Sequence, residues 1–329
     1  MLNGKTLLIT GGTGSFGKAC TKILLERYDL AKLIIFSRDE QKQYEMAQQF
    51  PMKSSPIRYF IGDVRDKERL QRAFRGVDYV IHAAAMKHVP ASEYNPTEAI
   101  KTNVHGAQNI VNVASDVGVQ RVVALSTDKA VSPVNLYGAT KLCSDKLFVA
   151  ANAFTANDAC RYSVVRYGNV MGSRGSVIPF FIRQRAKGVL PITDPRMTRF
   201  WITLEAGVEQ VLWALQNMKG GEIVVPKLPS MRITDLAEAV APGCKTEVVG
   251  IRPGEKLHEA MIAKADARNT VDMGKYYLIL PDTGFVELEC NHDCGTPVPE
   301  EFEYNSRDND WWLGVDEMRE VLRYQGWDI

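Results

Sequence analysis

The sequence predicts an α/β protein built on a doubly wound parallel sheet, with a smaller, interleaved C-terminal lobe. Six short apolar runs within the first 167 residues are typical of buried strands, and helical patterns separate them. A glycine-rich turn directly follows the first run. Beyond Tyr167 the chain becomes richer in glycine and polar side chains, which indicates a change of architecture.

The first strand, expected at residues 6–10, leads at once into Gly11-Gly-Thr-Gly-Ser-Phe-Gly17, and a helical pattern follows. This segment has the G-x-G-x-x-G spacing of the Rossmann-like dinucleotide fingerprint, in the strand–turn–helix context that the fingerprint requires. The glycines permit a tight turn, and the helix N-terminus faces a pyrophosphate. A turn used only for packing is the alternative. We expect the cofactor contacts here to come from Gly11, Thr13, Gly14, Ser15, Phe16 and Gly17.

The end of the second strand, expected at residues 32–36, favours NADP over NAD. An NAD-selective site usually carries an acid about 20 residues beyond the glycines, where it binds the ribose 2′-hydroxyl. Here Ser37 and Arg38 come first, and Arg38 with Lys42 offers positive charge to a 2′-phosphate. Ser37 and Glu40 also form a capping-box pattern for the next helix, which leaves Arg38 free. Asp39 lies slightly late for the ribose acid but stays an alternative.

The third and fourth strands, expected at residues 57–61 and 77–81, both end in candidate cofactor contacts. Asp63 is placed to bind an adenine amino group with Val64 against the ring, although a helix cap is the alternative role for Asp63. After the fourth strand, Lys87 lies in a loop expected to cover the cofactor and the substrate. Small side chains just before it let the backbone approach the cofactor; they are Ala83, Ala84 and Ala85.

The fifth strand, expected at residues 121–125, delivers Ser126-Thr-Asp-Lys129 to the sheet edge at which ligands bind. Tyr137 and Lys141 follow, four residues apart and therefore on one face of a helix. The positive charge of Lys141 favours tyrosinate and lowers the pKa of the phenol. Such a tyrosine can take a proton from an alcohol while a nicotinamide takes the hydride.

Three polar side chains beside this pair extend the expected chemistry. Thr127 offers a hydroxyl to the same substrate oxygen, while Asp128 and Lys129 supply a potential acid and a potential base. Simple alcohol oxidation requires neither, so the set predicts more than oxidation and reduction. A free lysine has a pKa of about 10.4. A base at Lys129 therefore requires burial or a neighbouring cation to lower its pKa.

Residues 1–167 are expected to form the NADP-binding domain, and residues 168–329 mainly a substrate-binding lobe, with 201–226 returning to the sheet. Three arginines of the lobe lie in loop-like segments beside glycine or proline, as a diphosphate clamp requires, and we expect two of them to touch phosphate. Solvated arginines are the alternative. The three are Arg174, Arg199 and Arg252, whereas His258 is expected to be structural.

The composition excludes several classes of function. Forty basic and 39 acidic residues among 329 give no bulk field for nucleic acid or a membrane. We find no signal peptide and no apolar run of about 18 residues. The histidines lack metal-ligand spacing, and Cys290-Asn-His-Asp-Cys294 reads as a polar loop, so no metal is expected. Dispersed cysteines indicate a cytoplasmic protein with reduced thiols; they stand at 20, 143, 160, 244, 290 and 294.

From Lys5 to about Glu259 the sequence resembles the extended short-chain dehydrogenase/reductases, and among them the inverting UDP-N-acetylglucosamine 4,6-dehydratases of the pseudaminic acid pathway. Related sugar-nucleotide dehydratases carry Asp-Glu in place of Asp128-Lys129, so Lys129 favours the UDP-N-acetylglucosamine branch. The matching segments are Thr10-Gly-Gly-Thr-Gly-Ser-Phe-Gly17, Ser37-Arg-Asp-Glu40, Ala83-Ala-Ala-Met-Lys-His-Val-Pro90, Ser126-Thr-Asp-Lys-Ala130, Asn135-Leu-Tyr-Gly-Ala-Thr-Lys141, Arg166-Tyr-Gly-Asn169, Gly172-Ser-Arg-Gly-Ser176, Arg199-Phe-Trp-Ile-Thr203 and Arg252-Pro-Gly-Glu-Lys-Leu-His258.

The resemblance implies oxidation of the sugar at C4 by Tyr137 and NADP, loss of water across C5 and C6, hydride return to C6 and inversion at C5. Lys129 is then the C5 base and Asp128 the acid for the departing 6-hydroxyl. A homo-oligomer, dimer or hexamer, and a product used in flagellin, capsule or lipopolysaccharide glycans are also implied. The implied substrate contacts are Lys87, Asn169, Arg174, Val177, Thr193, Arg199, Arg252 and Glu255.

Three other functions stay open from the residues alone. A retaining 4,6-dehydratase of the same substrate differs only in the stereochemistry at C5. A UDP-sugar 4-epimerase would not need Asp128 and Lys129. A catalytically silent NADP-binding regulator is harder to reconcile with the presence of both Tyr137 and Lys141.

Overall fold

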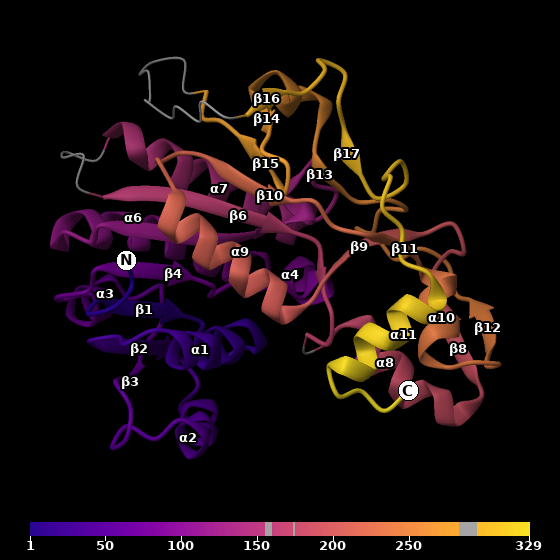
Figure 1. Ribbon diagram of the computed structural model, residues 1–329, viewed down its shortest axis with the longest axis horizontal. Helices are drawn as coiled ribbons and strands as arrows, with labels where there is room; N and C mark the ends of the chain where they lie inside the picture. The colour runs from indigo at the N-terminus through magenta and orange to yellow at the C-terminus, as the bar shows by residue number, and fades with distance from the viewer. Residues whose placement is uncertain (155–159, 174, 283–294) are drawn as a thin grey trace.

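A ten-stranded sheet forms the centre of the protein, shown in Figure 1 by a computed structural model that describes residues 1–154, 160–173, 175–282 and 295–329. The strands run in the order β16-β14-β15-β10-β6-β5-β4-β1-β2-β3. The last seven are parallel, and β15, β14 and β16 add antiparallel pairs at one edge. The parallel strands are β1 (Thr6–Thr10), β2 (Lys32–Ser37), β3 (Ile57–Ile61), β4 (Tyr79–His82), β5 (Arg121–Thr127), β6 (Arg161–Tyr167) and β10 (Ile223–Pro226). The doubly wound sheet predicted from the sequence is confirmed.

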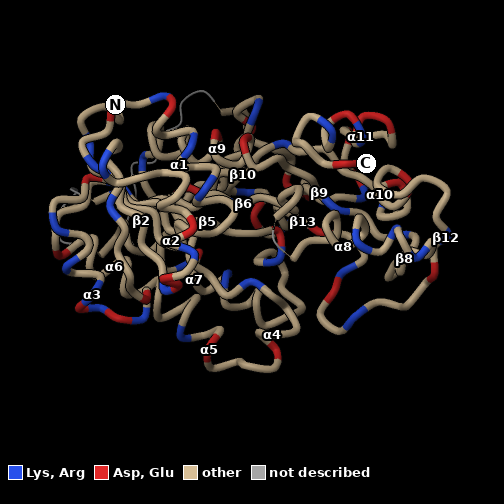
Figure 2. The backbone as a smooth tube through the Cα atoms, turned by 90° about the horizontal axis from the view of Figure 1, so that it is seen from below, with Lys and Arg blue, Asp and Glu red and all other residues tan. Residues whose placement is uncertain are grey.

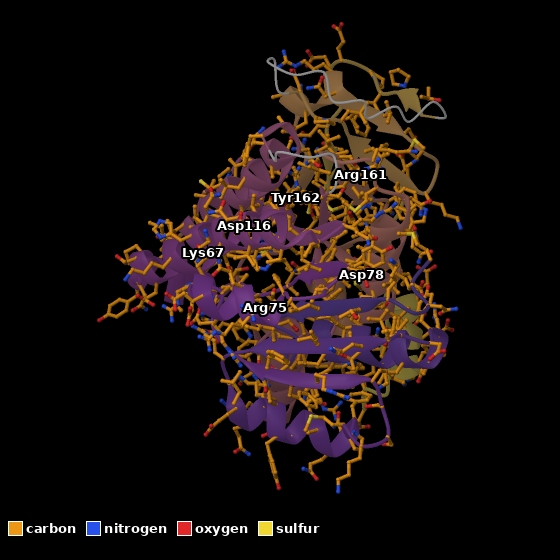
Figure 3. The ribbon with its side chains drawn as sticks, turned by 90° about the vertical axis from the view of Figure 1, so that its left-hand side faces the viewer. Lys67, Arg75, Asp78, Asp116, Arg161 and Tyr162 are labelled. Atoms are coloured by element: carbon orange, nitrogen blue, oxygen red, sulfur yellow. The ribbon has the colours of Figure 1, made fainter. Side chains whose placement is uncertain are left out.

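Helices cover both faces of this sheet. On one face α1 (Ser15–Arg27) packs against α9 (Leu204–Asn217), which also contacts β5 and β6. On the other face α3 (Lys67–Ala73), α6 (Gly106–Val117) and α7 (Leu136–Phe154) lie in a row. An ion pair of 3.7 Å between Lys67 and Asp116 links α3 to α6 at the surface (Figure 3). The shorter segments around them are α2 (Glu40–Gln49), α4 (Val89–Tyr94), α5 (Pro96–Ile100), a π-helical turn η1 (Lys101–His105) and η2 (Asp128–Ala130).

Two local expectations differ from the structure for identifiable reasons. The fourth strand starts at Tyr79 rather than at residue 77, because Val77 belongs to the turn after α3, where its N–H donates to the Phe74 carbonyl at 3.1 Å. The capping box from Ser37 to Glu40 is wrong: Asp39 caps α2 by accepting a hydrogen bond from the Lys42 N–H at 3.0 Å.

A smaller lobe has its own apolar core, formed around Phe181, Trp201, Leu236 and Met318. In its three-stranded sheet β9 (Thr198–Ile202) lies between β7 (Asn169–Val170) and β11 (Ser230–Arg232), and in a second sheet β8 (Val189–Ile192) pairs with β12 (Lys245–Val248). The helices of the lobe are α8 (Val177–Gln184), η3 (Arg185–Lys187), α10 (Ile233–Val240) and α11 (Val315–Tyr324).

The chain passes between the sheet and the small lobe more than once. It enters the lobe after β6, returns with α9 and β10, and leaves again with β11. It then returns through β13 (Ala260–Ile262), η4 (Lys264–Asn269), β14 (Thr270–Asp272), β15 (Tyr276–Ile279) and β16 (Thr296–Pro297). After β17 (Tyr304–Asn305), which pairs with β13, the last helix α11 packs on α10 of the lobe. The sheet and the lobe are therefore interleaved along the sequence.

Charges of both signs are interspersed along the backbone in Figure 2. Within the described ranges, no helix combines the length and the apolar character that a membrane crossing requires.

Candidate active site

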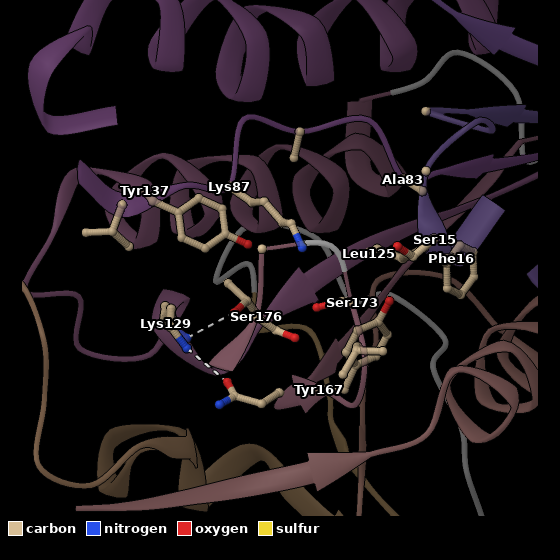
Figure 4. Close-up of a pocket in the computed structure, with 18 of the residues that line it drawn as sticks. Ser15, Phe16, Ala83, Lys87, Leu125, Lys129, Tyr137, Tyr167, Ser173 and Ser176 are labelled. Atoms are coloured by element: carbon tan, nitrogen blue, oxygen red, sulfur yellow. Dashed lines mark hydrogen bonds between the residues drawn. The ribbon is translucent and has the colours of Figure 1, made fainter. Parts of the chain in front are cut away.

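A cavity of about 1080 Å³ follows the carboxyl ends of the parallel strands and extends to the small lobe (Figure 4). On the sheet side it is lined by the turn after β1, by the ends of β2 to β5 and by the start of α7. On the lobe side it is lined by β7, the start of α8, the end of β8, β9 and residues 252–255. The topology therefore brings both groups of predicted residues to one space.

The glycine turn fits a dinucleotide. Gly11 has φ +64°, and a Cβ on it would lie 2.8 Å from the Ala84 backbone nitrogen, so only glycine allows the turn to lie against the alanine segment. A Cβ on Gly17 would lie 2.3 Å from the Gly12 oxygen, so the close packing of α1 on the turn requires a glycine at this position. The N-terminus of α1 begins at Ser15 and lines the cavity, as a pyrophosphate site requires.

The segment after β4 that contains Ala83, Ala84 and Ala85 is held in place by two buried side chains, Thr10 and Asn103. The Thr10 hydroxyl bonds to His82 Nδ1 at 2.8 Å and accepts from the Ala84 N–H at 3.2 Å. Asn103 bonds both backbone groups of Met86, at 2.8 and 2.9 Å, and reaches Thr140 on α7 at 3.0 Å. The π-helical turn that carries Asn103 thus fixes the loop of Lys87 against the helix of Tyr137.

Charges at the far end of the cavity are arranged around Asp63 and Asp39. Arg38 Nη1 lies 3.6 Å from Asp63, whereas Asp39 is engaged by Lys42 Nζ at 2.6 Å as well as by its cap. Burial raises the pKa of Asp63, but hydrogen bonds from Arg65 outweigh it and hold that pKa below its usual range. The alternative of a helix cap at Asp63 is wrong, because Asp66 caps α3.

Asp128, which is buried, and Lys129, which is partly exposed to the cavity, form an ion pair at the end of β5. The strand continues to Thr127, two residues beyond its expected end, and η2 begins at Asp128. Asp128 Oδ1 accepts from Thr127 Oγ1 and from Lys129 Nζ, both at 3.0 Å. The Asp128 side chain is fully buried and is not part of the cavity wall, which Thr127 and Lys129 line.

Tyr137 reaches this pair because α7 approaches η2 closely. A Cβ on Gly138 would lie 2.0 Å from the Lys129 carbonyl oxygen, so the glycine next to Tyr137 allows this approach. Tyr137, Lys87 and Lys129 point into the same space in Figure 4. Lys129 Nζ also donates to Asn169 Oδ1 at 3.5 Å, which joins the sheet side of the cavity to β7.

The electrostatics of Tyr137 differ from the expectation. Burial raises the pKa of Tyr137 to about 12, and the charge of Lys129 and a hydrogen bond with Thr127 oppose the rise. The cation that chiefly favours tyrosinate is therefore Lys129, rather than Lys141. Burial lowers the pKa of Lys141, and Asp145 opposes this effect. In the described part of the chain the buried Lys141 ammonium makes no hydrogen bond, which fits a group completed by a bound nucleotide.

The surroundings of Lys129 do not lower its pKa, contrary to what a base at this position requires. Burial does lower it, but the carboxylates of Asp128 and Glu259 outweigh burial and raise the pKa of Lys129 well above its usual range. Lys87, on the opposite side of the cavity, has a pKa lowered first by burial and then by the charge of Lys129.

The expected arginine clamp is only partly seen. Arg174 lies outside the described residues. Arg199 was expected in a loop but lies on β9, where its guanidinium donates to the carbonyl oxygens of Thr198, Leu257 and Lys256 at 2.7 to 3.0 Å. Because several of its donors are used, Arg199 anchors the segment 256–258. Arg252 is exposed and lies 3.8 Å from Glu255, and both line the cavity.

Residues 7–281 match the protein family described as polysaccharide biosynthesis protein. The chain belongs to this family. Two inverting UDP-N-acetylglucosamine 4,6-dehydratases from strains of Campylobacter jejuni are 56% identical to it over 98% of this chain and 99% of theirs. A UDP-glucose 4-epimerase from Rickettsia akari is 44% identical over 84% of this chain and 83% of its own. The family resemblance predicted from the sequence is confirmed.

Solved structures agree with this family assignment. Pen from Bacillus thuringiensis superposes with a TM-score of 0.90 at 34% identity and covers 99% of both chains. The dTDP-glucose 4,6-dehydratase DesIV from Streptomyces venezuelae, solved with NAD and TYD bound, gives a TM-score of 0.68 at 25% identity, with 77% of this chain and 86% of its own covered. The Rossmann-like fold of this family member is thereby confirmed.

The cavity gathers the predicted residues with two exceptions, Asp128 behind its wall and Arg174 outside the described residues. Val177, the first residue of α8, and Thr193 line the cavity, and the Thr193 hydroxyl donates to Met197 Sδ at 3.2 Å. His258 bonds Thr198 at 2.8 Å away from the wall, in keeping with a structural role. The run Cys290-Asn-His-Asp-Cys294 lies outside the described residues, among which no cluster suited to a metal ion is found.

One acidic residue at the site was not assigned a role from the sequence. Glu259 lines the cavity, is only 2% exposed and lies 3.5 Å from Lys129 Nζ. The one local signal is an acid that directly follows His258 and precedes the short apolar run of residues 260–262. Its partner stands 130 positions earlier, so the sequence alone gives no reason to pair them.

Proposed function

We propose that this protein is an inverting UDP-N-acetylglucosamine 4,6-dehydratase that forms UDP-2-acetamido-2,6-dideoxy-β-L-arabino-hex-4-ulose. The observation that carries the proposal is the group of Thr127, Lys129 and Tyr137 in one cavity, with Asp128 directly behind its wall and bonded to Thr127 and Lys129. It occurs in a chain 56% identical to the inverting dehydratases over nearly its whole length. An acid–base pair next to a redox tyrosine suits elimination better than oxidation alone.

In the proposed reaction Tyr137 takes the proton of the sugar 4-hydroxyl, with Thr127 bonded to the same phenol oxygen. NADP⁺, which the turn at Gly14 and Ser15 and the Arg38 guanidinium would hold, would supply the hydride acceptor for C4 and the hydride donor for C6. The 4-ketone acidifies C5, from which Lys129 takes a proton while Asp128 supplies one to the departing 6-hydroxyl. A solvent proton added to C5 on the opposite face inverts that carbon, and Tyr137 releases to solvent the proton that it took from the 4-hydroxyl.

The ion pair accounts for both proton transfers. Elimination needs a neutral amine at Lys129 and a protonated carboxyl at Asp128, whereas the raised pKa of Lys129 favours its ammonium form. One proton moved along the 3.0 Å bond from Lys129 Nζ to Asp128 Oδ1 produces the required forms without changing the net charge. After elimination the ion pair is restored. Thr127 Oγ1, which bonds Asp128 and lines the cavity, offers the buried carboxyl a relay to the sugar.

The finer properties belong to the same proposal. Arg38 faces the cavity, and Asp39 is occupied by Lys42, which favours NADP over NAD. Arg38→Glu should strongly raise the NADP⁺ concentration needed for half-maximal activity and raise that of NAD⁺ little. Both are measured by adding cofactor back to enzyme from which the bound cofactor has been removed. An unchanged ratio of the two would contradict NADP selectivity. A cytoplasmic homo-oligomer that acts in pseudaminic acid and flagellin glycan synthesis, without nucleic-acid or membrane partners, completes the proposal.

Time-resolved proton NMR of the enzyme with UDP-N-acetylglucosamine in D₂O tests the function. A new C6 methyl signal, deuterium at C5 and L-arabino couplings are expected. Retained D-xylo couplings would keep the dehydratase and refute inversion. Inversion at C4 without a methyl signal would favour a 4-epimerase, the activity named for the Rickettsia akari relative. Tight NADP binding without turnover of any UDP-sugar would favour the silent regulator.

A further inference from the structure

A second buried carboxylate lies beside the catalytic ion pair, and the proposed reaction does not use it. Glu259 directly precedes β13 and is held from both sides by Ser306: the Glu259 N–H donates to Ser306 Oγ at 3.0 Å, and the Ser306 N–H donates to the Glu259 carbonyl at 2.8 Å. This anchoring fixes the backbone of Glu259 beside the end of β17, the strand that pairs with β13.

The Glu259 side chain faces three cations. Its Oε1 lies 3.5 Å from Lys129 Nζ and 4.0 Å from Arg199 Nε, and its Oε2 lies 3.9 Å from Lys256 Nζ. Oε2 accepts no hydrogen bond within the described ranges, and Lys256 itself donates to the Val131 carbonyl at 2.6 Å. Arg199 likewise uses its terminal nitrogens on backbone oxygens. Lys129 is therefore the partner of Glu259 that faces the cavity without being committed to the backbone.

Lys129 accordingly lies between two carboxylates contributed by different parts of the chain. Asp128 bonds it from η2, and Glu259 approaches it from the segment before β13. The other polar and charged groups that face it are Asn169 on β7, Arg199 on β9, Lys256, Lys87 in the loop after β4 and Tyr137 on α7. The ammonium is anchored on three sides, so its nitrogen has a defined place at the cavity wall.

We propose that Glu259 is a positioning residue for Lys129: its carboxylate fixes the ammonium against Asp128 and Asn169 and retains the proton that the pair needs for elimination. This role rests on the proposed function. Glu259 does not exchange protons with the sugar; it sets how readily Lys129 loses its proton to solvent. Without Glu259 the pair would lose that proton at lower pH and then lack the acid for the 6-hydroxyl.

The first test is the pH dependence of kcat for release of the 4-keto product in Glu259→Gln. Removal of an opposite charge within about 4–6 Å lowers the pKa of a lysine by about 1–3 units. The alkaline limb of the pH profile should therefore shift to lower pH by the same amount. In Glu259→Asp, which keeps the carboxylate, the alkaline limb should lie close to its wild-type pH. Glu222→Gln is the matched control, because Glu222 is equally buried and its carboxylate accepts from the Lys219 and Gly220 N–H groups, away from the cavity.

A second measurement does not depend on turnover. Amine acylation followed by peptide mass spectrometry reports the neutral fraction of each lysine, and at pH 8 the labelling of Lys129 should rise about 10-fold or more in Glu259→Gln. The exposed Lys22 serves as the internal reference. A wild-type enzyme without product would refute the proposed function. An active wild type with an unmoved alkaline limb and unchanged Lys129 labelling in the variant would refute the role of Glu259, and a lower melting temperature alone would indicate a merely structural carboxylate.

Discussion

Gly138→Ala should separate the two halves of the catalytic group while leaving the fold intact. A Cβ at this position would lie 2.0 Å from the Lys129 carbonyl oxygen, 2.9 Å from its carbon and 3.1 Å from Pro133 Cβ. Contacts shorter than 3.0 Å are essentially not found for real Cβ atoms, and the two closest atoms belong to the backbone. Either α7 or η2 must therefore retreat by about 1 Å.

The expected effect on stability is smaller than the effect on activity. Overpacking costs about 1–3 kcal/mol, and the change from glycine to alanine within a helix returns about 1 kcal/mol, so the free energy of unfolding should fall by about 0–2 kcal/mol. Tyr137 is the preceding residue, and a displacement of about 1 Å in a catalytic group lowers the rate by about 100-fold. We expect kcat to fall by that order.

Urea unfolding and the NMR assay of the 4-keto product would measure the two effects on the same preparation. Gly207→Ala is the matched control, because Gly207 also lies in a helix, α9, and its Cβ would meet only Ile202 Cδ1 at 3.9 Å. The control should keep its kcat. A Gly138→Ala enzyme with wild-type kcat would show that the contact of α7 with η2 does not set the position of Tyr137.

Two further predictions concern stability and substrate affinity. His82 is buried, and burial followed by the charge of Lys141 lowers its pKa to about 3 from 6.5, so the stability it contributes at neutral pH is lost as the pH falls below 6.5. Between pH 7 and 5 the free energy of unfolding should fall by about 2 kcal/mol on account of His82. Urea titrations of His82→Gln should show no such fall. An equal fall in both proteins would contradict the assignment of this pH dependence to His82. The Trp327 ring lies against Gly172, where a Cβ would meet it at 2.4 Å, and so supports the loop that lines the cavity at Ser173 and Ser176. Trp327→Ala should raise the KM for the UDP-sugar more than it lowers kcat, and the opposite split in steady-state kinetics would refute this.

The fold was predictable because its signals are local. The third strand has the expected bounds, and the glycine turn needs only its neighbours in the sequence to be interpreted. The same locality explains why the residues at the ends of neighbouring parallel strands could be expected in one cavity. The wrong helix cap shows the limit of such patterns, since Ser37 and Asp39 both precede α2 and only the path of the chain selects between them.

The charge states at the site depend on contacts between distant segments. Arg199 has the flanking residues of a loop but belongs to β9, because β7 and β11 pair with it on both sides. The pKa of Lys129 is raised by the adjacent Asp128 and by Glu259, which stands 130 positions later in the sequence. No pattern near Lys129 in the sequence encodes that neighbour, so the direction of its pKa shift could only be found in three dimensions.

The repeated passage of the chain between the sheet and the lobe restricts how the cavity can open. A two-domain enzyme joined by one linker can close like a clamshell, with the dihedral changes confined to a few hinge residues. Here connections after β6, before α9, after β10, before β13 and after β17 run between the two parts, and Glu259 and Asn169 tie them together at Lys129. A rotation of the lobe would have to change all of these connections together. Entry and exit of the nucleotide sugar are therefore expected to depend on the local motion of loops at the cavity mouth, with the catalytic geometry in place before the substrate arrives.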